Sequence, residues 1–301
     1  MSARVDIRER LDDTEIAEVL GLVEAATEAD GVRPLNEHVM LHLRYGGDPR
    51  ARSLLLYQQD VLAGYAHVDP TDEVEGPSAE LVIHPAHRRH GNGAHLLRSV
   101  LDLTGGRLRL WAHGGHPAAG ALAAAFGMER VRSLWQMRRS LFAPLEPYTL
   151  PEGVRLRTFV PGQDEEAWLK VNAAAFAHHP EQGAWTADDL LRREREPWFE
   201  PEGFFLAFRG DRLAGFHWTK IHGSSDHGHE PLGEVYVVGV DPSQQGTGLG
   251  KALTLAGLAH LRARGLGQAM LYVDEANTPA IRLYEALGFA RWDVDVMYAA
   301  V

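Results

Sequence analysis

Hydrophobic and polar positions repeat along this chain in two similar series, one in each half. In the first half, Ser53 to Tyr65 (SLLLYQQDVLAGY) is an apolar run, a short turn near Asp60 and a second apolar run. Phe204 to Phe216 (FFLAFRGDRLAGF) has the same order and the same Leu-Ala-Gly triplet. Two apolar runs around such a turn are typical of a β-hairpin. We therefore expect one hairpin in each half.

Two further blocks repeat in the same order. LVIHPAHRRHGNGAHLL (residues 81–97) matches VVGVDPSQQGTGLGKAL (residues 237–253), and LRLWAHGGHPAAGALAAAFGMERV matches MLYVDEANTPAIRLYEALGFARW downstream. Repeated blocks in a fixed order indicate duplication of a domain of roughly 140 residues. The sequence predicts one domain over residues 1–140, a proline-rich linker over residues 141–152 and a second domain over residues 153–301.

Each half combines strands with helices. A charged strand (VDIRER or VRLRTF) precedes a helical stretch, which we expect at Thr14–Ala29 with Thr14 as its N-cap, and at Glu165–Phe176. Apolar residues keep helical spacing after a glycine-rich turn in both halves. Interleaved strands and helices predict an α/β (α+β) protein with a mixed sheet and helices packed on it, built twice.

Composition excludes several classes of protein. The 301 residues include no Cys, which rules out disulfides, thiolate metal sites and a cysteine nucleophile. The first residues are charged and no run of about 18 apolar residues occurs, so we expect a cytoplasmic protein without a membrane segment. The net charge of −11 disfavours nucleic acid as a partner.

A glycine-rich loop follows an apolar strand and precedes a helix in both halves. Glycines allow the backbone to approach a phosphate, and the helix N-terminus favours an anion, so both loops are predicted to bind phosphate. Neither has the spacing of a Walker A loop. The loop residues are Gln245, Gly246, Thr247, Gly248, Leu249, Gly250 and Lys251 in the second half, and Arg88, Arg89, His90, Gly91, Asn92 and Gly93 in the first.

These loops and the downstream Asn277-Thr-Pro-Ala280-x-x-x-Tyr284-x-x-x-Gly288-Phe289 resemble the GNAT acyl-CoA N-acetyltransferases, and the resemblance covers both halves. It implies two tandem GNAT-type domains with acetyl-CoA as co-substrate. The segments GEVYVVGVDP, HHPEQGAWT and HWTK resemble one group within this family. That resemblance implies acetyl transfer to a small amine-bearing thiol, the cysteinyl amine of a cysteinyl-glucosaminyl-inositol.

An amine attacks a thioester only as the neutral base, so the site needs a proton acceptor and a proton donor for the departing thiolate. Glu234 stands in an otherwise apolar strand, where a carboxylate is costly unless it is paired or functional; the alternative is a solvated strand start. The resemblance implies Glu234 as general base and Tyr284 as general acid, and the alternative for Tyr284 is a packed core ring. Without cysteine, transfer would be direct.

The two halves differ at these positions. Laying Pro85 on Pro242 sets Pro77 opposite Glu234, and laying Gly127 on Gly288 sets Ala123 opposite Tyr284. Glu80 is three positions away from Pro77, which on a regular strand would turn it to the opposite face; the alternative is a bulge, which would undo this parity. We therefore expect catalysis in the second half only, with a first half that binds CoA without turnover or binds nothing.

The resemblance also implies further contact residues. The strand before each loop should bind the pantetheine arm, and a helix start should flank the thiol; these residues are Val238, Gly239, Val240, Leu81, Val82 and Ile83, and then Asn277, Ala280 and Arg282. The acceptor should meet Glu234 together with Glu37, Glu181, Lys220 and Tyr272. Glu37 would place the acceptor between the domains, although a solvated helix position is the alternative. For Lys220 the alternative is a surface position after a strand.

Three histidines, His222, His227 and His229, fall in one segment, HGSSDHGHE. A metal site is the alternative there, but no H-E-x-x-H spacing accompanies them, so we predict no metal and a loop that covers the substrate. Two other functions stay open: a tandem GNAT enzyme for an aminoglycoside, polyamine or peptide, and a CoA-binding protein without turnover. A monomer is expected.

Overall fold

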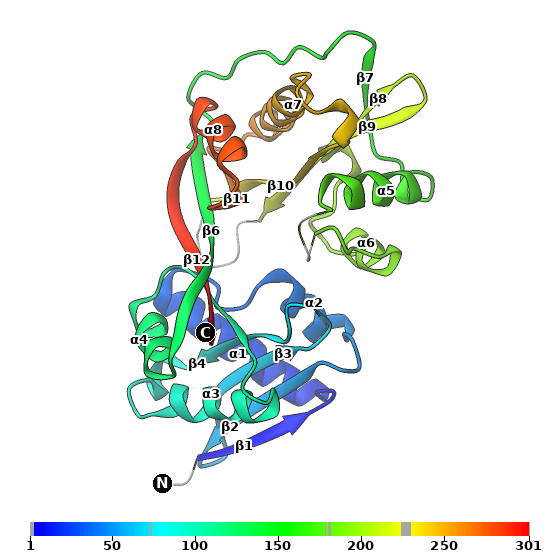
Figure 1. Ribbon diagram of the computed structural model, residues 1–301. Coiled ribbons are helices and arrows are strands. Elements are labelled where there is room, and N and C mark those ends of the chain that lie inside the picture. The colour runs from blue at the N-terminus through cyan, green and yellow to red at the C-terminus, as the bar shows by residue number, and fades with distance from the viewer. Residues whose placement is uncertain (1–2, 73, 178, 180–181, 224–229, 301) are drawn as a thin grey trace. The chain divides into compact units, whose positions relative to one another are not determined.

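The computed structural model describes residues 3–72, 74–177, 179, 182–223 and 230–300 (Figure 1). The chain divides into two compact units. The first unit consists of Met1–Leu134 with Asp293–Val301, and the second consists of Trp135–Trp292.

The first unit is a mixed sheet with helices on both faces. Its sheet has the order β1-β2-β3-β4-β5-β12, antiparallel except for the parallel pair β4 and β5. The strands are β1 (Ala3–Arg8), β2 (Arg52–Gln58), β3 (Val61–Asp69), β4 (Ser78–Ile83) and β5 (Arg109–Ala112). The helices are α1 (Asp13–Asp30), α2 (Glu37–Tyr45), α3 (Asn92–Leu103) and α4 (Pro117–Ala125), with the short η1 (Pro85–His87).

The second unit repeats this plan with the order β6-β11-β10-β9-β8-β7. Its strands are β7 (Val154–Thr158), β8 (Phe204–Arg209), β9 (Arg212–His222), β10 (Leu232–Val240) and β11 (Gln268–Asp274). Its helices are α5 (Glu165–Ala175), α6 (Ala187–Glu194), α7 (Leu249–Ala263) and α8 (Thr278–Ala286), with η2 (Pro201–Gly203) and η3 (Pro242–Gln244). The predicted hairpins and helices are confirmed to within a few residues.

The closing strands of the two repeats are exchanged. Strand β6 (Met128–Ser140) passes into the second unit at Trp135, and Met137 is buried in that unit's core. Strand β12 (Ala290–Ala300) passes into the first unit at Asp293, where it pairs antiparallel with β5 from Val296 onward. The division at residues 1–140 and 153–301 describes the sequence repeats, and the compact units differ from it by this exchange.

Alternating strand residues build a core on each face of both sheets. In the first unit, Val82 packs with α1 and α2, while Ala79 packs with α3. In the second unit, Val237 packs with α5 and α6, while Val235 packs with α7 and α8. The two faces are named below by the helices that cover them.

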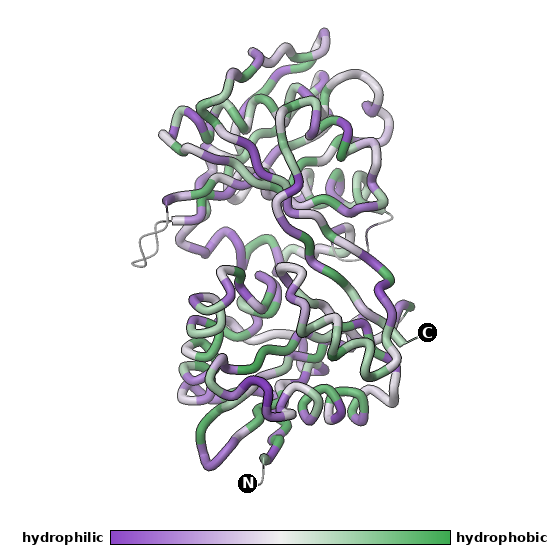
Figure 2. The backbone as a smooth tube through the Cα atoms, turned by 90° about the vertical axis from the view of Figure 1, so that its left-hand side faces the viewer, coloured by the Kyte–Doolittle hydropathy of each residue, from purple (hydrophilic) through white to green (hydrophobic). Residues whose placement is uncertain are grey.

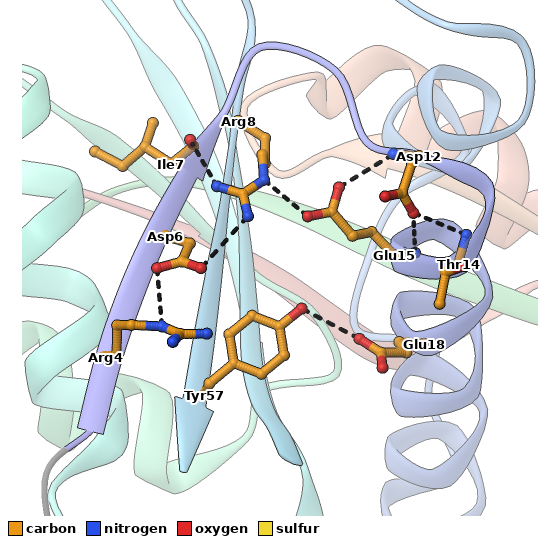
Figure 3. A network of polar contacts seen from close by, with 9 residues as sticks. All are labelled: Arg4, Asp6, Ile7, Arg8, Asp12, Thr14, Glu15, Glu18 and Tyr57. Atoms are coloured by element: carbon orange, nitrogen blue, oxygen red, sulfur yellow. Dashed lines mark hydrogen bonds and ion pairs between the residues drawn. The ribbon is translucent and has the colours of Figure 1, made fainter. Parts of the chain in front are cut away.

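Helix α1 begins one residue earlier than predicted, and its N-cap is Asp12 rather than Thr14 (Figure 3). The Asp12 carboxylate accepts hydrogen bonds from the backbone of Thr14 (2.9 Å) and Glu15 (2.8 Å). Glu15 in turn accepts from the Asp12 backbone (3.1 Å) and from Arg8 of β1 (2.7 Å). This reciprocal capping box satisfies more free N–H groups than a cap at Thr14 could.

Within the described ranges, no helix is long and apolar enough to cross a membrane. Hydrophilic and hydrophobic segments alternate along the helices in Figure 2.

Candidate active site

The candidate site begins where β10 and β11 separate. These parallel strands pair from Gly233 to Val235 of β10, and their pairing ends there although β10 continues to Val240. On its other side, β10 stays paired with β9 to its end, with Tyr236 skipped as a bulge. The sheet is therefore split beside the last residues of β10.

Backbone groups of β10 point into this split at alternate residues. The N–H of Asp241 donates to the carbonyl of Ala214 on β9 (2.9 Å). Because neighbouring residues of a strand face opposite sides, Gly239 also faces β9, whereas Val240 and Val238 face the split. Val238 and Val240 can therefore bind an extended amide-containing ligand. Gly239 instead leaves room for the Phe216 ring, since a Cβ at this position would lie 2.7 Å from that ring.

The first unit has the same split. Strands β4 and β5 pair from Ser78 to Glu80, and the His84 N–H donates to Ala63 of β3 (2.9 Å). By the same alternation, Leu81 and Ile83 face the split and the backbone of Val82 faces β3. Both units therefore offer a similar row of backbone donors and acceptors.

The glycine-rich loops have the same conformation in both units. Gly246 and Gly248 have φ of +76° and +86°, and Arg89 and Gly91 in the first unit have +65° and +81°. Gly248 is the N-cap of α7 and Gly91 is the N-cap of α3, and neither has a side chain that caps the helix. The first N–H groups of both helices can therefore bind an anion. Left-handed backbone at Arg89 costs about 1 kcal/mol or more in a residue with a Cβ.

The first residue of each motif ties the loop to its strand. The Gln245 amide donates to Val240 O (3.5 Å), and Arg88 Nε donates to Ile83 O (3.0 Å). Arg88 also makes two hydrogen bonds of 2.7 Å with Asp30 of α1. The structure therefore gives Arg88 an anchoring contact within the protein. Among the other predicted loop residues, Thr247 donates its hydroxyl to Gln244 O (2.7 Å).

Two predicted CoA contacts also have partners within the second unit. The ammonium of Lys251 lies 2.7 Å from the Glu146 carboxylate of the linker, and both side chains are largely exposed. Such an exposed pair contributes little stability and is easily exchanged for a phosphate. Asn277 is the N-cap of α8 and accepts from Ala280 N (3.2 Å), and Arg282 lies exposed in the same helix.

Glu234 is buried and paired. Only 6% of the residue is exposed, and its Oε2 lies 2.7 Å from Nε2 of His222 at the end of β9. Lys220 stands directly opposite it in the antiparallel register. The alternative of a solvated strand start is therefore wrong. Sequence reasoning missed His222 as a partner of Glu234, although it follows Lys220 by two positions and so shares its face.

Aromatic rings surround Lys220 on the same face. Its ammonium lies 4.2 Å from the ring centre of Trp198 and 5.1 Å from that of Tyr236. Arg193 of α6 donates to the Tyr236 hydroxyl (2.8 Å) and lies 3.8 Å from the ring centre of Trp185. These residues are scattered in sequence, so no local motif pointed to them.

Tyr284 lies on the other face of the sheet. It is 8% exposed and packs in the core beneath α7 and α8 with Val235 and Leu271. Burial raises the pKa of Tyr284 to about 12, so the phenol keeps its proton at neutral pH. Glu234, the neighbour of Val235 on β10, faces α5 and α6. The two residues predicted to transfer protons thus lie on opposite faces of the split strand pair.

The other predicted acceptor contacts are spread over the chain. Tyr272 of β11 is 40% exposed, and its hydroxyl lies 3.0 Å from Nε2 of Gln136. Glu37 is the first residue of α2 in the first unit, and Glu181 lies outside the described residues. His227 and His229 also lie outside them. Within the described ranges, no group of His, Cys, Asp or Glu residues is arranged to hold a metal ion.

The bulge at Tyr236 changes the comparison between the repeats. When Leu62-Ala63-Gly64 is laid on Leu213-Ala214-Gly215, the strand registers set Ser78, not Pro77, opposite Glu234. The registers of β3 and β4 run without a bulge, so Glu80 lies two positions from Ser78 and on the same face. The expectation that Glu80 faces the opposite side is wrong, because a bulge reverses strand parity.

Glu80 belongs to a buried charge cluster. Its Oε1 lies 3.5 Å from Nε2 of His113, and Oε2 accepts from the backbone of Asn36 (2.7 Å). Nδ1 of His113 lies 2.9 Å from Asp295 of the exchanged strand β12. Burial alone would lower the pKa of His113, but Glu80 and Asp295 outweigh it and raise that pKa to about 10. In the first unit, the Glu80 carboxylate is thus held in an ion cluster with His113 and Asp295.

Comparison with known proteins identifies the class. The family described as Acetyltransferase (GNAT) family matches residues 20–128 and 168–289. The chain belongs to this family, and it is an acetyl-CoA-dependent N-acetyltransferase. Both predictions, of two tandem GNAT domains and of this enzyme class, are confirmed.

Particular relatives narrow the comparison. The chain is 67% identical to the mycothiol acetyltransferase of Streptosporangium roseum and 64% identical to that of Thermobispora bispora, with 99% of each chain covered in both cases. The predicted resemblance to one group within the family is thereby confirmed.

Solved structures support the same fold. A GCN5-related N-acetyltransferase from Sphaerobacter thermophilus has a TM-score of 0.67 at 25% identity, with 98% of this chain and 95% of that chain covered. A tandem GNAT protein from the clavulanic acid biosynthesis pathway has a TM-score of 0.74 at 18% identity, with 100% and 99% covered. The latter likeness concerns the fold alone.

Proposed function

We propose that this enzyme transfers the acetyl group of acetyl-CoA to the cysteinyl amine of 1D-myo-inositol 2-(L-cysteinylamino)-2-deoxy-glucopyranoside, giving mycothiol and CoA. The relatives named mycothiol acetyltransferase support this acceptor. The observation that carries the chemistry is the buried, paired carboxylate of Glu234 beside the split between β10 and β11.

In this proposal, acetyl-CoA lies in the split of the second unit. Val238 and Val240 would bind its pantetheine amides, and the Gln245–Lys251 loop its phosphates, with Lys251 leaving Glu146. Val235 sits where the strands part, so the thioester end would lie near Glu234 on one face and Tyr284 on the other.

Each polar group then has one task. Glu234 is needed to remove the proton from the acceptor nitrogen, and Tyr284 gives its proton to the departing sulfur. The raised pKa of Tyr284 keeps that proton available at neutral pH. Lys220, Tyr272 and the aromatic rings near Lys220 would bind the hydroxyl-rich acceptor, as polar groups on an apolar surface do in small-molecule sites. Glu37 and Glu181 remain candidates for the same role.

The first unit would not catalyse acetyl transfer. It has Ser78 and Ala123 at the positions of Glu234 and Tyr284, and its nearby carboxylate, Glu80, is engaged by His113. Its split and loop match those of the second unit, which supports CoA binding there without acetyl transfer.

An acceptor screen tests the proposal. Protein supplied with acetyl-CoA should release free CoA with the cysteinyl-glucosaminyl-inositol amine, and at least about tenfold more slowly with spermidine or an aminoglycoside, a difference of about 1.4 kcal/mol in the activation free energy. Free CoA can be followed with a thiol reagent after subtraction of the acceptor's own thiol. Equal rates on all acceptors would contradict the proposed specificity, and release without acceptor would indicate hydrolysis only.

A further inference from the structure

An imidazole holds the carboxylate of Glu234. Nε2 of His222 lies 2.7 Å from Oε2 of Glu234, and the two side chains are 36% and 8% exposed. A carboxylate oxygen only accepts hydrogen bonds, so Nε2 carries the hydrogen and donates it. Nδ1, the second ring nitrogen, then has a lone pair that can accept a proton.

The sheet itself sets this contact. His222 ends β9, and the antiparallel register places Lys220 opposite Glu234 and His222 opposite Leu232. Residues two apart on a strand share a face, so His222 and Lys220 flank Glu234 on the face covered by α5 and α6. Lys220 extends over Trp198 and Tyr236. The imidazole is therefore positioned by strand pairing.

Basicity favours the imidazole for the proton transfer. A general base is most effective when its pKa lies near the working pH. Free imidazoles titrate about two units closer to neutrality than free carboxyls. A carboxylate that accepts from one ring nitrogen fixes the tautomer and stabilises the imidazolium that forms when the other nitrogen takes a proton.

We propose that His222 takes the proton from the acceptor nitrogen and that Glu234 orients the ring and stabilises its charged form. This inference rests on the proposed function, in which Glu234 is required for that deprotonation. Nδ1 of His222 takes a proton from the protonated acceptor amine, and the neutral nitrogen then bonds to the acetyl carbon and loses its second proton to water. As the C–S bond breaks, the sulfur takes the Tyr284 proton, and exchange with water resets both side chains.

The first unit lacks both members of the pair. With the two Leu-Ala-Gly triplets aligned, Ser78 stands at the position of Glu234 and Thr71 at that of His222. Neither side chain is a base at neutral pH. The pair thus belongs to the unit in which we propose turnover.

The test separates proton transfer from support of Glu234. In His222→Gln, an amide N–H can still donate to Glu234 but the side chain cannot carry a proton. We expect kcat at pH 7 to fall about 100-fold with little change in the KM for acetyl-CoA. His222→Ala should lose as much and regain activity with added imidazole. His38→Gln removes an imidazole that lies 3.3 Å from Asp69 in the first unit, and should behave as wild type.

The outcomes are distinct. Wild-type kcat in His222→Gln, together with loss in Glu234→Gln, would overturn this inference and leave Glu234 as the base of the proposed function. Loss in His222→Gln without imidazole rescue of His222→Ala would also overturn it, since the ring would then act only structurally. Full activity of Glu234→Gln would instead remove Glu234 from the proposed function itself.

Discussion

Glu234→Gln is expected to lower kcat at pH 7 by about two orders of magnitude or more, the usual effect of losing general-base proton transfer, for which Glu234 is required. The amide keeps the size of the side chain, and its oxygen can still accept a hydrogen bond from Nε2 of His222. It has no negative charge, however, and cannot stabilise the positively charged imidazolium. The KM for acetyl-CoA should change little, because the phosphate loop is at the other end of β10. Steady-state rates with varied acetyl-CoA measure both quantities.

The pH dependence gives a second readout of the same variant. Free α-amino groups titrate at about 8, so raising the pH from 7 to 9 increases the neutral fraction of the acceptor. The defect of Glu234→Gln should shrink over that range, since less deprotonation is required of the enzyme. Glu202→Gln, which changes an exposed carboxylate of the same unit, is the control and should stay wild type. Wild-type turnover in Glu234→Gln would contradict the assignment.

Asp295→Asn is expected to destabilise the protein by about 3 kcal/mol or more at pH 7, because it leaves the buried charge of His113 only partly compensated. For a unit of this size the midpoint of thermal unfolding should fall by about 6–12 °C. Asp293→Asn, two residues earlier on β12, is the matched control and should shift stability by less than about 0.5 kcal/mol.

The loss of stability in Asp295→Asn should become smaller as the pH rises. The pKa of His113 is raised to about 10, so its pairing stabilises the fold fully below the ordinary histidine pKa of about 6.5. This stability is lost as the pH rises towards 10, and the difference between wild type and Asp295→Asn should narrow accordingly. Unfolding by denaturant at pH 7 and pH 10 measures it. An equal difference at both pH values would contradict a charged His113.

Local features of the fold could be predicted from the sequence. The hairpins, the helices after the loops and the glycine-rich turns depend on residues close in the chain, and the structure has them where the pattern places them. Exchange of β6 and β12 could not be predicted. A closing strand has the same alternation whichever unit it joins, and the choice depends on contacts with distant residues such as His113.

Candidate site residues could be proposed from the sequence, but their arrangement in space could not. Glu234 and Tyr284 were singled out by their residue types and by resemblance. The bulge at Tyr236 is a single skipped residue that leaves no mark on the hydrophobic pattern, yet it decides which residue of the first unit matches Glu234. The contact between His222 and Glu234 depends on the register of β9 and β10, which pattern alone does not fix.

The most direct test of catalysis in the second unit compares Gly248→Asp with Gly91→Asp. Both glycines have a positive φ and directly precede a helix, and a Cβ at either position would meet open space. The two substitutions should therefore cause similar backbone strain. An added carboxylate should repel phosphate only from its own loop. We predict that Gly248→Asp lowers kcat/KM for acetyl-CoA at least about tenfold, the effect of about 1.4 kcal/mol, while Gly91→Asp stays within about twofold of wild type. Loss of activity in Gly91→Asp with retention in Gly248→Asp would contradict the account.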